Sequence, residues 1–256
     1  MKVSIVIPTK NEHGNIDRLI KLINKTTKEN KITSEILVVD DQSEDGTIQD
    51  VEALQKEQNN IKLIQRAKYS YLFPKFPNKW RYIGLGSAHK IGYNLAQGDL
   101  IISMDGDLSH HPKELPKLIK KIKSGFDVCV GSRYIGGGGS DKHIINRFVS
   151  RFGSTYLAII CGIKIKDLST GYRAIKKNIW EKIKNKYYSN DNNFLIESLY
   201  YAHKSGAKIV EIPIFFKERE IGESKTPLLK ETIKAFLLPI KLKIYLKKYN
   251  NIKINS

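Results

Sequence analysis

Acidic side chains recur at the ends of apolar segments in this sequence: Glu12, then Asp40 with Asp41, then Asp105 with Asp107. Carboxylates gathered at one place repel one another unless a cation lies between them. Oxygen ligands of this kind suit Mg²⁺ or Mn²⁺ ions that are shared with phosphate groups. The cluster stands out in a chain with 44 Lys and Arg against 26 Asp and Glu, which gives a net charge of +18. We therefore predict a divalent-cation site that works on a phosphorylated substrate.

Each carboxylate on its own has a simpler explanation, because an Asp at the end of a strand often makes a turn or caps the next helix. The recurrence at three strand ends favours a site over three unrelated caps. Gly106, between Asp105 and Asp107, also allows the main chain to approach a ligand closely.

The elements expected to position these carboxylates alternate between strands and helices. Short apolar runs predict strands at residues 3–7, 35–39, 61–64, 100–104 and 126–130. Apolar residues at helical spacing predict helices at residues 19–23, 47–56, 88–96 and 112–123. This alternation implies a parallel sheet with helices on both faces. The fold class is therefore α/β, a three-layer arrangement of nucleotide-binding type, in which ligands bind at the carboxyl ends of the strands.

The second half of the chain is less regular. We predict a flexible glycine loop at residues 136–139, a helix at 144–161 and a strand at 208–216. A basic amphipathic helix at 228–249 is interrupted by Pro239.

Composition is that of an ordinary globular protein, with 41% hydrophobic and 27% charged residues. Two cysteines, Cys129 and Cys161, exclude a disulfide framework and fit a reducing compartment. The apolar run near the N-terminus is too short for a signal peptide, and the uncharged runs 152–163 and 235–240 fall short of the roughly 20 residues that span a bilayer. We therefore expect a cytoplasmic protein with no transmembrane segment.

The ordered set of motifs resembles glycosyltransferase family 2, and within it the dolichyl-phosphate (polyprenyl-phosphate) mannose synthase branch. The motifs lie at residues 7–12 (IPTKNE), 39–47 (VDDQSEDGT), 84–88 (GLGSA), 104–112 (MDGDLSHHP), 131–134 (GSRY), 167–173 (DLSTGYR), 211–213 (EIP) and 219–225 (REIGESK). A single DxD motif is a weak signal, whereas this many motifs in order are specific.

The resemblance implies a GT-A type, Rossmann-like catalytic domain over residues 1–226, followed by a basic amphipathic helix over residues 227–256. It implies inverting, metal-dependent transfer of a hexose from a nucleotide sugar to a polyprenyl or dolichyl phosphate. The favoured reaction moves mannose from GDP-mannose. The alternative uses a UDP-sugar such as UDP-glucose, or another acceptor.

The resemblance also assigns roles to individual residues. The expected nucleotide-sugar-binding residues are Pro8, Lys10, Glu12, Val39, Asp41, Asp105, Gly106, Asp107, Arg133, Arg219 and Lys225. Asp105 and Asp107 are expected to hold Mg²⁺ or Mn²⁺, and Asp107 and Arg133 to be catalytic. The residues expected near the acceptor phosphate are Arg147, Ser150 and Arg151.

The chemistry agrees with these roles. The leaving nucleoside diphosphate gains negative charge, which a divalent metal stabilises and which Arg and Lys can also meet. The acceptor is a phosphate monoester with a second pKa of about 6, so it is already anionic at neutral pH and needs no general base. Asp107 is therefore better described as a metal ligand than as a base.

Two parts of the chain depart from the family pattern. Lys10 stands where this branch commonly carries an aromatic residue, and residues 68–82 form an aromatic-rich insertion that either contacts substrate or lies on the surface. His110 and His111 precede Pro112, and we expect them to support the site from behind or to begin the next helix.

The C-terminal helix has two explanations that the sequence leaves open. Its lysines and apolar stripe suit an anionic membrane surface, and they equally suit a helix packed on the domain with solvated lysines. A lipid acceptor favours the membrane. Because the chain has no span of its own, a separate small membrane-anchoring subunit is a further hypothesis.

A nucleic-acid-binding module is the remote alternative, and it rests only on the net charge of +18. Clustered carboxylates would repel nucleic-acid phosphates unless a metal were bound. We therefore expect no nucleic-acid partner.

Overall fold

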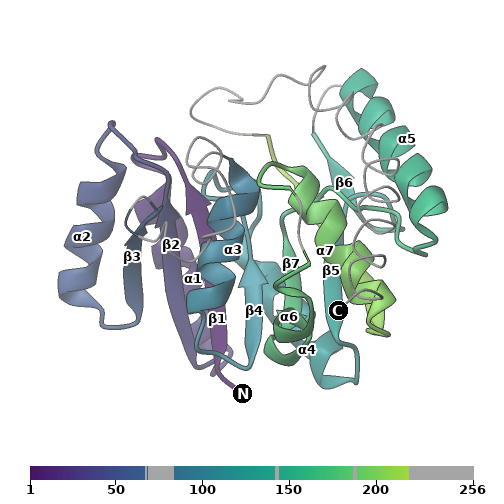
Figure 1. The fold of residues 1–256 in the computed structure, drawn as a ribbon. Helices are drawn as coiled ribbons and strands as arrows, with labels where there is room; N and C mark the ends of the chain where they lie inside the picture. Colours follow the sequence, from purple (N-terminus) through teal and green to yellow (C-terminus); the bar gives the residue numbers. More distant parts are fainter. Residues whose placement is uncertain (67, 69–83, 142–143, 187–188, 219–256) are drawn as a thin grey trace, which may run out of the picture.

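The computed structural model describes residues 1–66, 68, 84–141, 144–186 and 189–218. Its centre is a seven-stranded sheet in the order β3-β2-β1-β4-β7-β5-β8 (Figure 1). The strands of this sheet are β1 (Val3–Thr9), β2 (Ser34–Asp40), β3 (Ile61–Gln65), β4 (Leu100–Ser103), β5 (Val128–Ser132), β7 (Arg173–Lys176) and β8 (Ile209–Pro213). The five strands predicted from apolar runs are all present.

Most pairs in the sheet are parallel, as the alternating pattern predicts. β1 pairs with β2 on one side and with β4 on the other, both in parallel. β7 is the exception, because it lies between β4 and β5 and runs antiparallel to both. The prediction of an all-parallel sheet was therefore wrong at this position. β7 has only four residues, two of them charged, and so lacks the apolar run by which the other strands were found.

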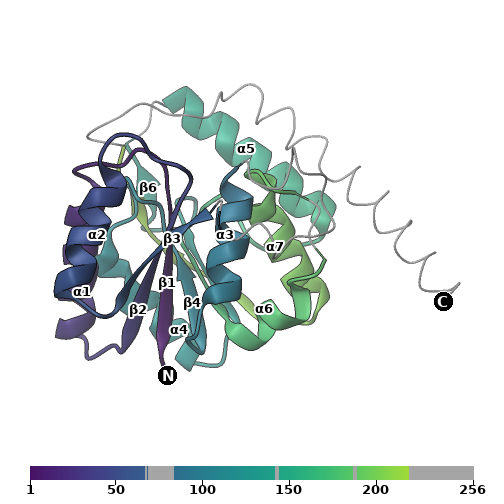
Figure 2. The same cartoon turned by 60° about the vertical axis from the view of Figure 1, so that its left-hand side comes forward.

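Helices cover both faces of the sheet and make three layers. The helices are α1 (Ile16–Glu29), α2 (Thr47–Glu57), α3 (Leu85–Leu95), α4 (Leu115–Lys123), α5 (Ile144–Cys161), α6 (Lys177–Ile183) and α7 (Asn193–Lys204), with a 3₁₀ turn at Pro112–Glu114. α1, α2 and α4 pack on one face, and α3, α6 and α7 on the other (Figure 2). The C-terminal part of α5 packs on the same face as α3, α6 and α7.

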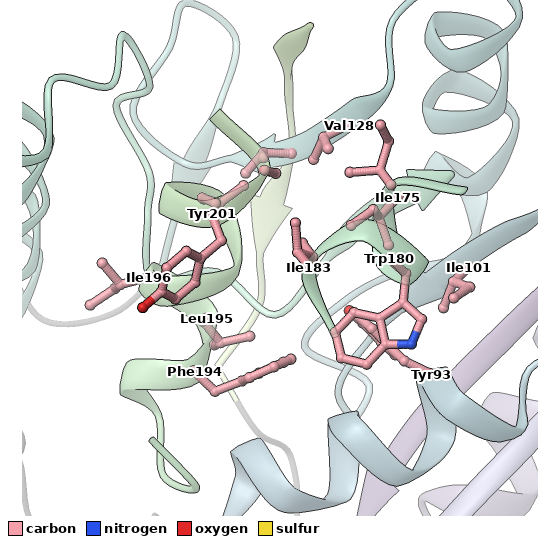
Figure 3. Close-up of a cluster of buried hydrophobic side chains, with 14 of the residues drawn as sticks. Tyr93, Ile101, Val128, Ile175, Trp180, Ile183, Phe194, Leu195, Ile196 and Tyr201 are labelled. Carbon is pink, nitrogen blue, oxygen red and sulfur yellow. The ribbon is translucent and has the colours of Figure 1, made fainter. Parts of the chain in front are cut away.

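The two faces hold separate hydrophobic cores because side chains alternate along each strand. In β1, Ile5 and Ile7 enter the core under α1, α2 and α4, while Val6 enters the core under α3, α6 and α7. Figure 3 shows part of the second core, in which the ring of Tyr93 meets that of Trp180 edge-on at 5.0 Å between centroids. Both cores lie beneath the edge where the strands end, and they fix the positions of those ends.

The predicted strand at residues 208–216 is divided in two. β8 ends at Pro213, and β9 (Phe215–Phe216) pairs instead with β6 (Gly139–Ser140) in a second, two-stranded sheet. Gly139 therefore belongs to a strand, whereas the sequence predicted a loop there.

Among the residues that the structure describes, no helix is long and apolar enough to cross a membrane. The predicted C-terminal helix at 227–256 and residues 69–82 of the aromatic-rich insertion lie outside the described residues.

Candidate active site

The predicted carboxylates lie at the carboxyl end of the central sheet. β1 is flanked by β2 and β4, so the chain leaves β1 in one direction for β2 and reaches β4 on the opposite side. Loops at such a point diverge and leave room for a ligand. The residues that follow β1, β2 and β4 are those that the sequence assigned to nucleotide and metal.

The Asp105–Gly106–Asp107 turn follows β4 after one intervening residue, Met104. The Asp105 side chain is 29% exposed, whereas Asp107 is 3% exposed. Asp107 Oδ1 accepts hydrogen bonds from the Ser109 main-chain N–H at 3.1 Å and from the Ser109 hydroxyl at 2.6 Å. The main-chain N–H of Asp105 donates to Nδ1 of His110 at 3.0 Å. Both aspartates are thus held in place from within the same short turn.

Gly106 brings this turn against the loop that follows β1. A Cβ atom at position 106 would lie 2.9 Å from Thr9 Cγ2 and 3.5 Å from Glu12 Cγ, which is too close to the Thr9 methyl. Glu12 is buried beside the turn, and its Oε2 accepts a hydrogen bond from Asn15 Nδ2 at 3.2 Å. The structure therefore brings Glu12 together with the two aspartates.

The two acidic residues at the end of β2, Asp40 and Asp41, have different surroundings. Asp40 is buried, and its carboxylate accepts hydrogen bonds from the main chain and hydroxyl of Ser43. This is the turn-forming role given above as the simpler explanation. Asp41 is partly exposed and forms an ion pair with Arg66, while its main-chain N–H donates to Thr9 O at 2.9 Å.

Arg66 was not predicted from the sequence. It is 4% exposed, and its guanidinium also donates to the Ser87 hydroxyl and to Gly84 O. Burial lowers the pKa of Arg66, and the nearby Asp41 opposes that shift. Arg66 thereby joins the end of β2 to the start of α3. The one sequence signal near Arg66 was the motif Gly84–Leu85–Gly86, and it did not point to Arg66 itself.

The remaining predicted nucleotide residues are placed as follows. Pro8 and Val39 are paired across β1 and β2, and both are buried. The side chain of Val39 belongs to the hydrophobic core, so any contact from it to a nucleoside has to use its main chain. Lys10 is exposed at the edge of the site. Arg219 and Lys225 lie outside the described residues.

The donor atoms of the turn fit a hard divalent cation. Asp105 and Asp107 supply carboxylate oxygens, the ligand type of Mg²⁺ and Mn²⁺. In the part of the chain that the structure describes, no group of three or more His, Cys, Asp or Glu side chains could hold a metal by itself. Mg²⁺ is commonly held by one or two carboxylates together with substrate phosphates. This pair of aspartates matches that arrangement.

Arg133 follows β5 and has a buried carboxylate partner. Its Nε and Nη2 donate to the two oxygens of Asp167 at 2.7 and 2.8 Å, and Nη2 also donates to the Ser169 hydroxyl at 2.9 Å. Burial opposes the charge on both groups, but their attraction prevails: the pKa of Arg133 is raised and that of Asp167 is lowered. Glu211 fixes the Asp167 loop by accepting from the main-chain N–H groups of Lys166 and Asp167.

The predicted acceptor residues lie on α5. Ser150 accepts a hydrogen bond from the Tyr134 hydroxyl at 2.7 Å, and the Arg133 guanidinium lies over the Tyr134 ring at 5.0 Å from its centre. Tyr134 therefore joins Arg133 to Ser150. Arg147 and Arg151 are exposed on the same helix.

His110 and His111 have separate roles. His110 is buried behind the aspartate turn, as described above, and His111 caps the 3₁₀ turn by accepting from Lys113 N at 3.1 Å. His110 thus supports the aspartate turn from behind and His111 begins the next helical turn, which are the two roles expected for this pair.

Comparison with known proteins identifies the family. The sequence pattern of glycosyl transferase family 2 matches residues 4–184, which is more than half of the chain. The chain belongs to glycosyltransferase family 2. It is accordingly an enzyme, a glycosyltransferase, and the resemblance seen in its motifs is confirmed.

Similar curated proteins of this family carry related names. A dolichol-phosphate mannosyltransferase of Pyrococcus furiosus is 34% identical over 88% of this chain and 59% of the relative. A polyprenol monophosphomannose synthase of Mycolicibacterium smegmatis is 33% identical over 86% of this chain and 79% of the relative. An undecaprenyl-phosphate mannosyltransferase of Micrococcus luteus is 31% identical over 88% of this chain and 87% of the relative. The chain thus spans about three fifths of the Pyrococcus protein and most of the other two.

Solved structures confirm the fold. Glucosyl-3-phosphoglycerate synthase from Mycobacterium tuberculosis, in complex with Mn²⁺, UDP and phosphoglyceric acid, superposes with a TM-score of 0.66. The match covers 93% of this chain and 78% of that one at 18% identity. The same synthase has also been solved with Mg²⁺ and UDP. At this identity the likeness shows the GT-A type α/β fold alone.

Proposed function

We propose that this glycosyltransferase transfers mannose from GDP-mannose, with inversion, to a polyprenyl or dolichyl phosphate, and that it requires Mg²⁺ or Mn²⁺. The observation that carries the proposal is the close approach of Glu12 to the Asp105–Gly106–Asp107 turn at the carboxyl edge of the sheet. The names of the relatives supply the sugar and the acceptor class.

The donor would bind across the ends of β1, β2 and β4. Asp105 and Asp107 would hold the cation against the diphosphate, and Asp41 and Glu12 would face the nucleoside side. When bound, the metal stabilises the charge that the diphosphate gains as it leaves. Pro8, Lys10, Val39, Gly106, Arg219 and Lys225 complete the proposed donor site.

Arg133 would act at the junction between donor and acceptor. In the reaction, a phosphate oxygen of the acceptor forms a bond to the anomeric carbon, and the bond from that carbon to the diphosphate breaks with its electron pair. No proton has to move, because the acceptor phosphate is already ionised at neutral pH. Ser150, Arg147 and Arg151 would bind the acceptor phosphate, with Ser150 held by Tyr134 beside Arg133.

A membrane surface is the expected place of this reaction. Phe148, Phe152 and Ile159 of α5 are 67%, 67% and 75% exposed, and their spacing places them on one side of the helix. Basic Arg147 and Arg151 are exposed on the same helix. An apolar side with neighbouring positive charge suits the interface of an anionic membrane. The C-terminal segment 227–256 would add to this contact.

The proposed location is the cytoplasmic face of that membrane, where the protein is peripheral. Cys129 and Cys161 are both buried thiols, as suits a reducing compartment. Nucleic acid is not a proposed partner. A small membrane-anchoring subunit remains a hypothesis for the complete system.

Sugar transfer in liposomes tests the proposal. The purified chain is given a polyprenyl phosphate and radiolabelled GDP-mannose, with and without Mn²⁺, and UDP-glucose is used in parallel. We expect Mn²⁺-dependent formation of lipid-linked mannose, with a loss of at least a hundredfold for Asp107→Asn. Asp127→Asn, which removes a carboxylate at the amino-terminal end of β5, is the matched control and should retain activity.

Each other outcome points elsewhere. Labelling from UDP-glucose alone would overturn the donor while leaving the reaction type in place. Transfer by the purified chain alone would refute the anchoring subunit. Full activity in the presence of a metal chelator would overturn the metal requirement.

A further inference from the structure

His110 lies directly behind the aspartate turn and is 1% exposed. Its Nδ1 accepts the main-chain N–H of Asp105 at 3.0 Å. Asp105 Oδ2 lies further from the same Nδ1, at 3.5 Å, so the main-chain N–H makes the closer contact. Because a main-chain N–H can only donate, this hydrogen bond requires Nδ1 without a proton, which assigns the proton of the neutral ring to Nε2. A ring in this state cannot bind a metal through Nδ1, because the lone pair there is already engaged.

Aromatic contacts hold the ring of His110 in one orientation. Tyr172 stacks on it at 5.0 Å between centroids, with 29° between the planes, and Phe216 meets it edge-on at 5.4 Å. Tyr172 is itself fixed, since its hydroxyl donates to His111 O at 3.1 Å. The acceptor atom is therefore presented to Asp105 in a fixed direction.

The second ring nitrogen, Nε2, does not explain why a histidine is present at this position. His110 Nε2 is buried and has no hydrogen-bond partner among the described residues. A buried donor without a partner is unfavourable, whereas an apolar ring at the same place would avoid the cost. Packing alone therefore does not account for a histidine here, and the contact of Nδ1 with Asp105 does.

The turn that His110 closes needs such support. Leu108 has φ = +64°, a left-handed conformation that is unfavourable because the Cβ atom approaches the following carbonyl oxygen. Ser109 fixes the carboxylate of Asp107 by two hydrogen bonds, while His110 fixes the main chain of Asp105. Each aspartate is thus fixed by a different residue of the same turn.

We propose that His110 is a positioning residue of the cation site, which sets the direction of the Asp105 carboxylate by accepting the Asp105 main-chain N–H. The inference rests on the proposed function, since it assumes that Asp105 is a metal ligand. Residues that orient metal ligands in this way typically change metal affinity by about 10- to 100-fold when they are replaced.

Three substitutions separate positioning from packing. His110→Asn keeps an acceptor, because its Oδ1 is as many bonds from the main chain as Nδ1, but it loses the aromatic stack. His110→Phe keeps the stack and loses the acceptor. His110→Gln moves the acceptor one bond further out. If His110 positions Asp105, Asn preserves metal affinity better than Phe or Gln, although Phe packs best.

The measurement is Mn²⁺ affinity in the presence of saturating GDP, followed through the electron paramagnetic resonance signal of free Mn²⁺, with UDP in parallel. We expect Mn²⁺ affinity to fall at least tenfold in the His110→Phe and His110→Gln variants and less than about threefold in the His110→Asn variant. Metal-free thermal unfolding reports the packing separately. His111→Asn is the control and should bind Mn²⁺ as the unsubstituted protein does.

The outcomes distinguish the two proposals. Equal Mn²⁺ affinity of the Phe variant and the unsubstituted protein would overturn the role of His110 alone. Absence of Mn²⁺ binding by the unsubstituted protein with either nucleotide would overturn the proposed metal dependence, and the inference with it. Should the Phe variant not fold, the comparison of Asn with Gln still decides, and equal affinities for that pair would refute the inference.

Discussion

Arg133 and Asp167 form a buried ion pair at the edge of the candidate site. The Asp167 side chain is fully buried and that of Arg133 is 10% exposed. Removing one partner of such a pair leaves an uncompensated charge, which is far more costly than loss of a surface pair. The pair therefore fixes the guanidinium over the ring of Tyr134, which bonds Ser150, and also contributes to folding.

We predict that Asp167→Asn lowers the free energy of unfolding by about 3–5 kcal/mol at pH 7. The pKa of Asp167 is lower in the folded protein than in the unfolded chain, where it is about 3.9. The contribution of the pair is thus fully present above pH ~4 and is lost as the pH falls through the lower folded value. Urea unfolding at a series of pH values should show the two proteins converging only below that range.

The control for this prediction is Asp127→Asn. Asp127 pairs with Lys176 at 2.8 Å, but the two side chains are 22% and 31% exposed. A pair in such contact with water is worth about 0–1 kcal/mol. A cost for Asp167→Asn as small as that of Asp127→Asn would contradict the assignment of a buried pair.

At the scale of elements, α3 packs closely on β1 and β2, the strands that carry residues predicted to bind the nucleotide. A Cβ atom at Gly92 would lie 2.3 Å from Val6 Cγ1 and 3.1 Å from Val39 Cγ2. Valine side chains have few rotamers and cannot move aside easily. Gly153 of α5, in contrast, has nothing within 4 Å of the same position. Close packing thus requires a glycine at position 92, whereas packing leaves room for a side chain at position 153.

The same substitution should therefore have opposite effects in the two helices. Gly92→Ala is expected to destabilise the protein by about 1–3 kcal/mol through overpacking, although Ala is the better helix former. Gly153→Ala is expected to stabilise α5 by about 0.5–1 kcal/mol. Urea unfolding measures the first effect and hydrogen exchange of the α5 amides the second. A stabilising Gly92→Ala would show that α3 lies further from the sheet than described.

At the scale of the whole molecule, the chain has a net charge of +18, whereas its candidate site is built from carboxylates. A field of this sign attracts anionic membranes and phosphorylated substrates alike. The exposed apolar side of α5 provides a second, charge-independent attraction. The two contributions can be told apart by their dependence on salt, because the screening length falls from about 10 Å at 0.1 M to 3 Å at 1 M.

We predict that the protein floats with vesicles containing phosphatidylglycerol at low salt and much less with pure phosphatidylcholine vesicles. Raising NaCl to 1 M should weaken the binding several-fold but not abolish it. The double substitution Phe148→Ser with Phe152→Ser should remove the salt-resistant part. Phe215→Ser, which changes an exposed aromatic residue on β9, is the control. Equal flotation of the double variant and the unsubstituted protein would exclude α5 as the contact.

Much of the fold could be predicted from the sequence because its signals are local. The apolar runs that became β1, β2 and β4 show themselves within five to seven residues, and the acidic residues that follow them mark the carboxyl edge. β7 could not be predicted, since it is short and is stabilised by its neighbours β4 and β5. The division between β8 and β9 likewise depends on pairing with distant strands.

The candidate site shows the same division. Residue types and their order along the chain determined the family, the α/β class, the reaction type and the acidic centre, because these depend on which groups are present. The tertiary structure decided which groups meet: Arg66 with Asp41, Asp167 with Arg133, and Tyr134 with Ser150. These partners are 16 to 34 residues apart in the chain, and only packing of the sheet and its helices brings them within hydrogen-bonding distance.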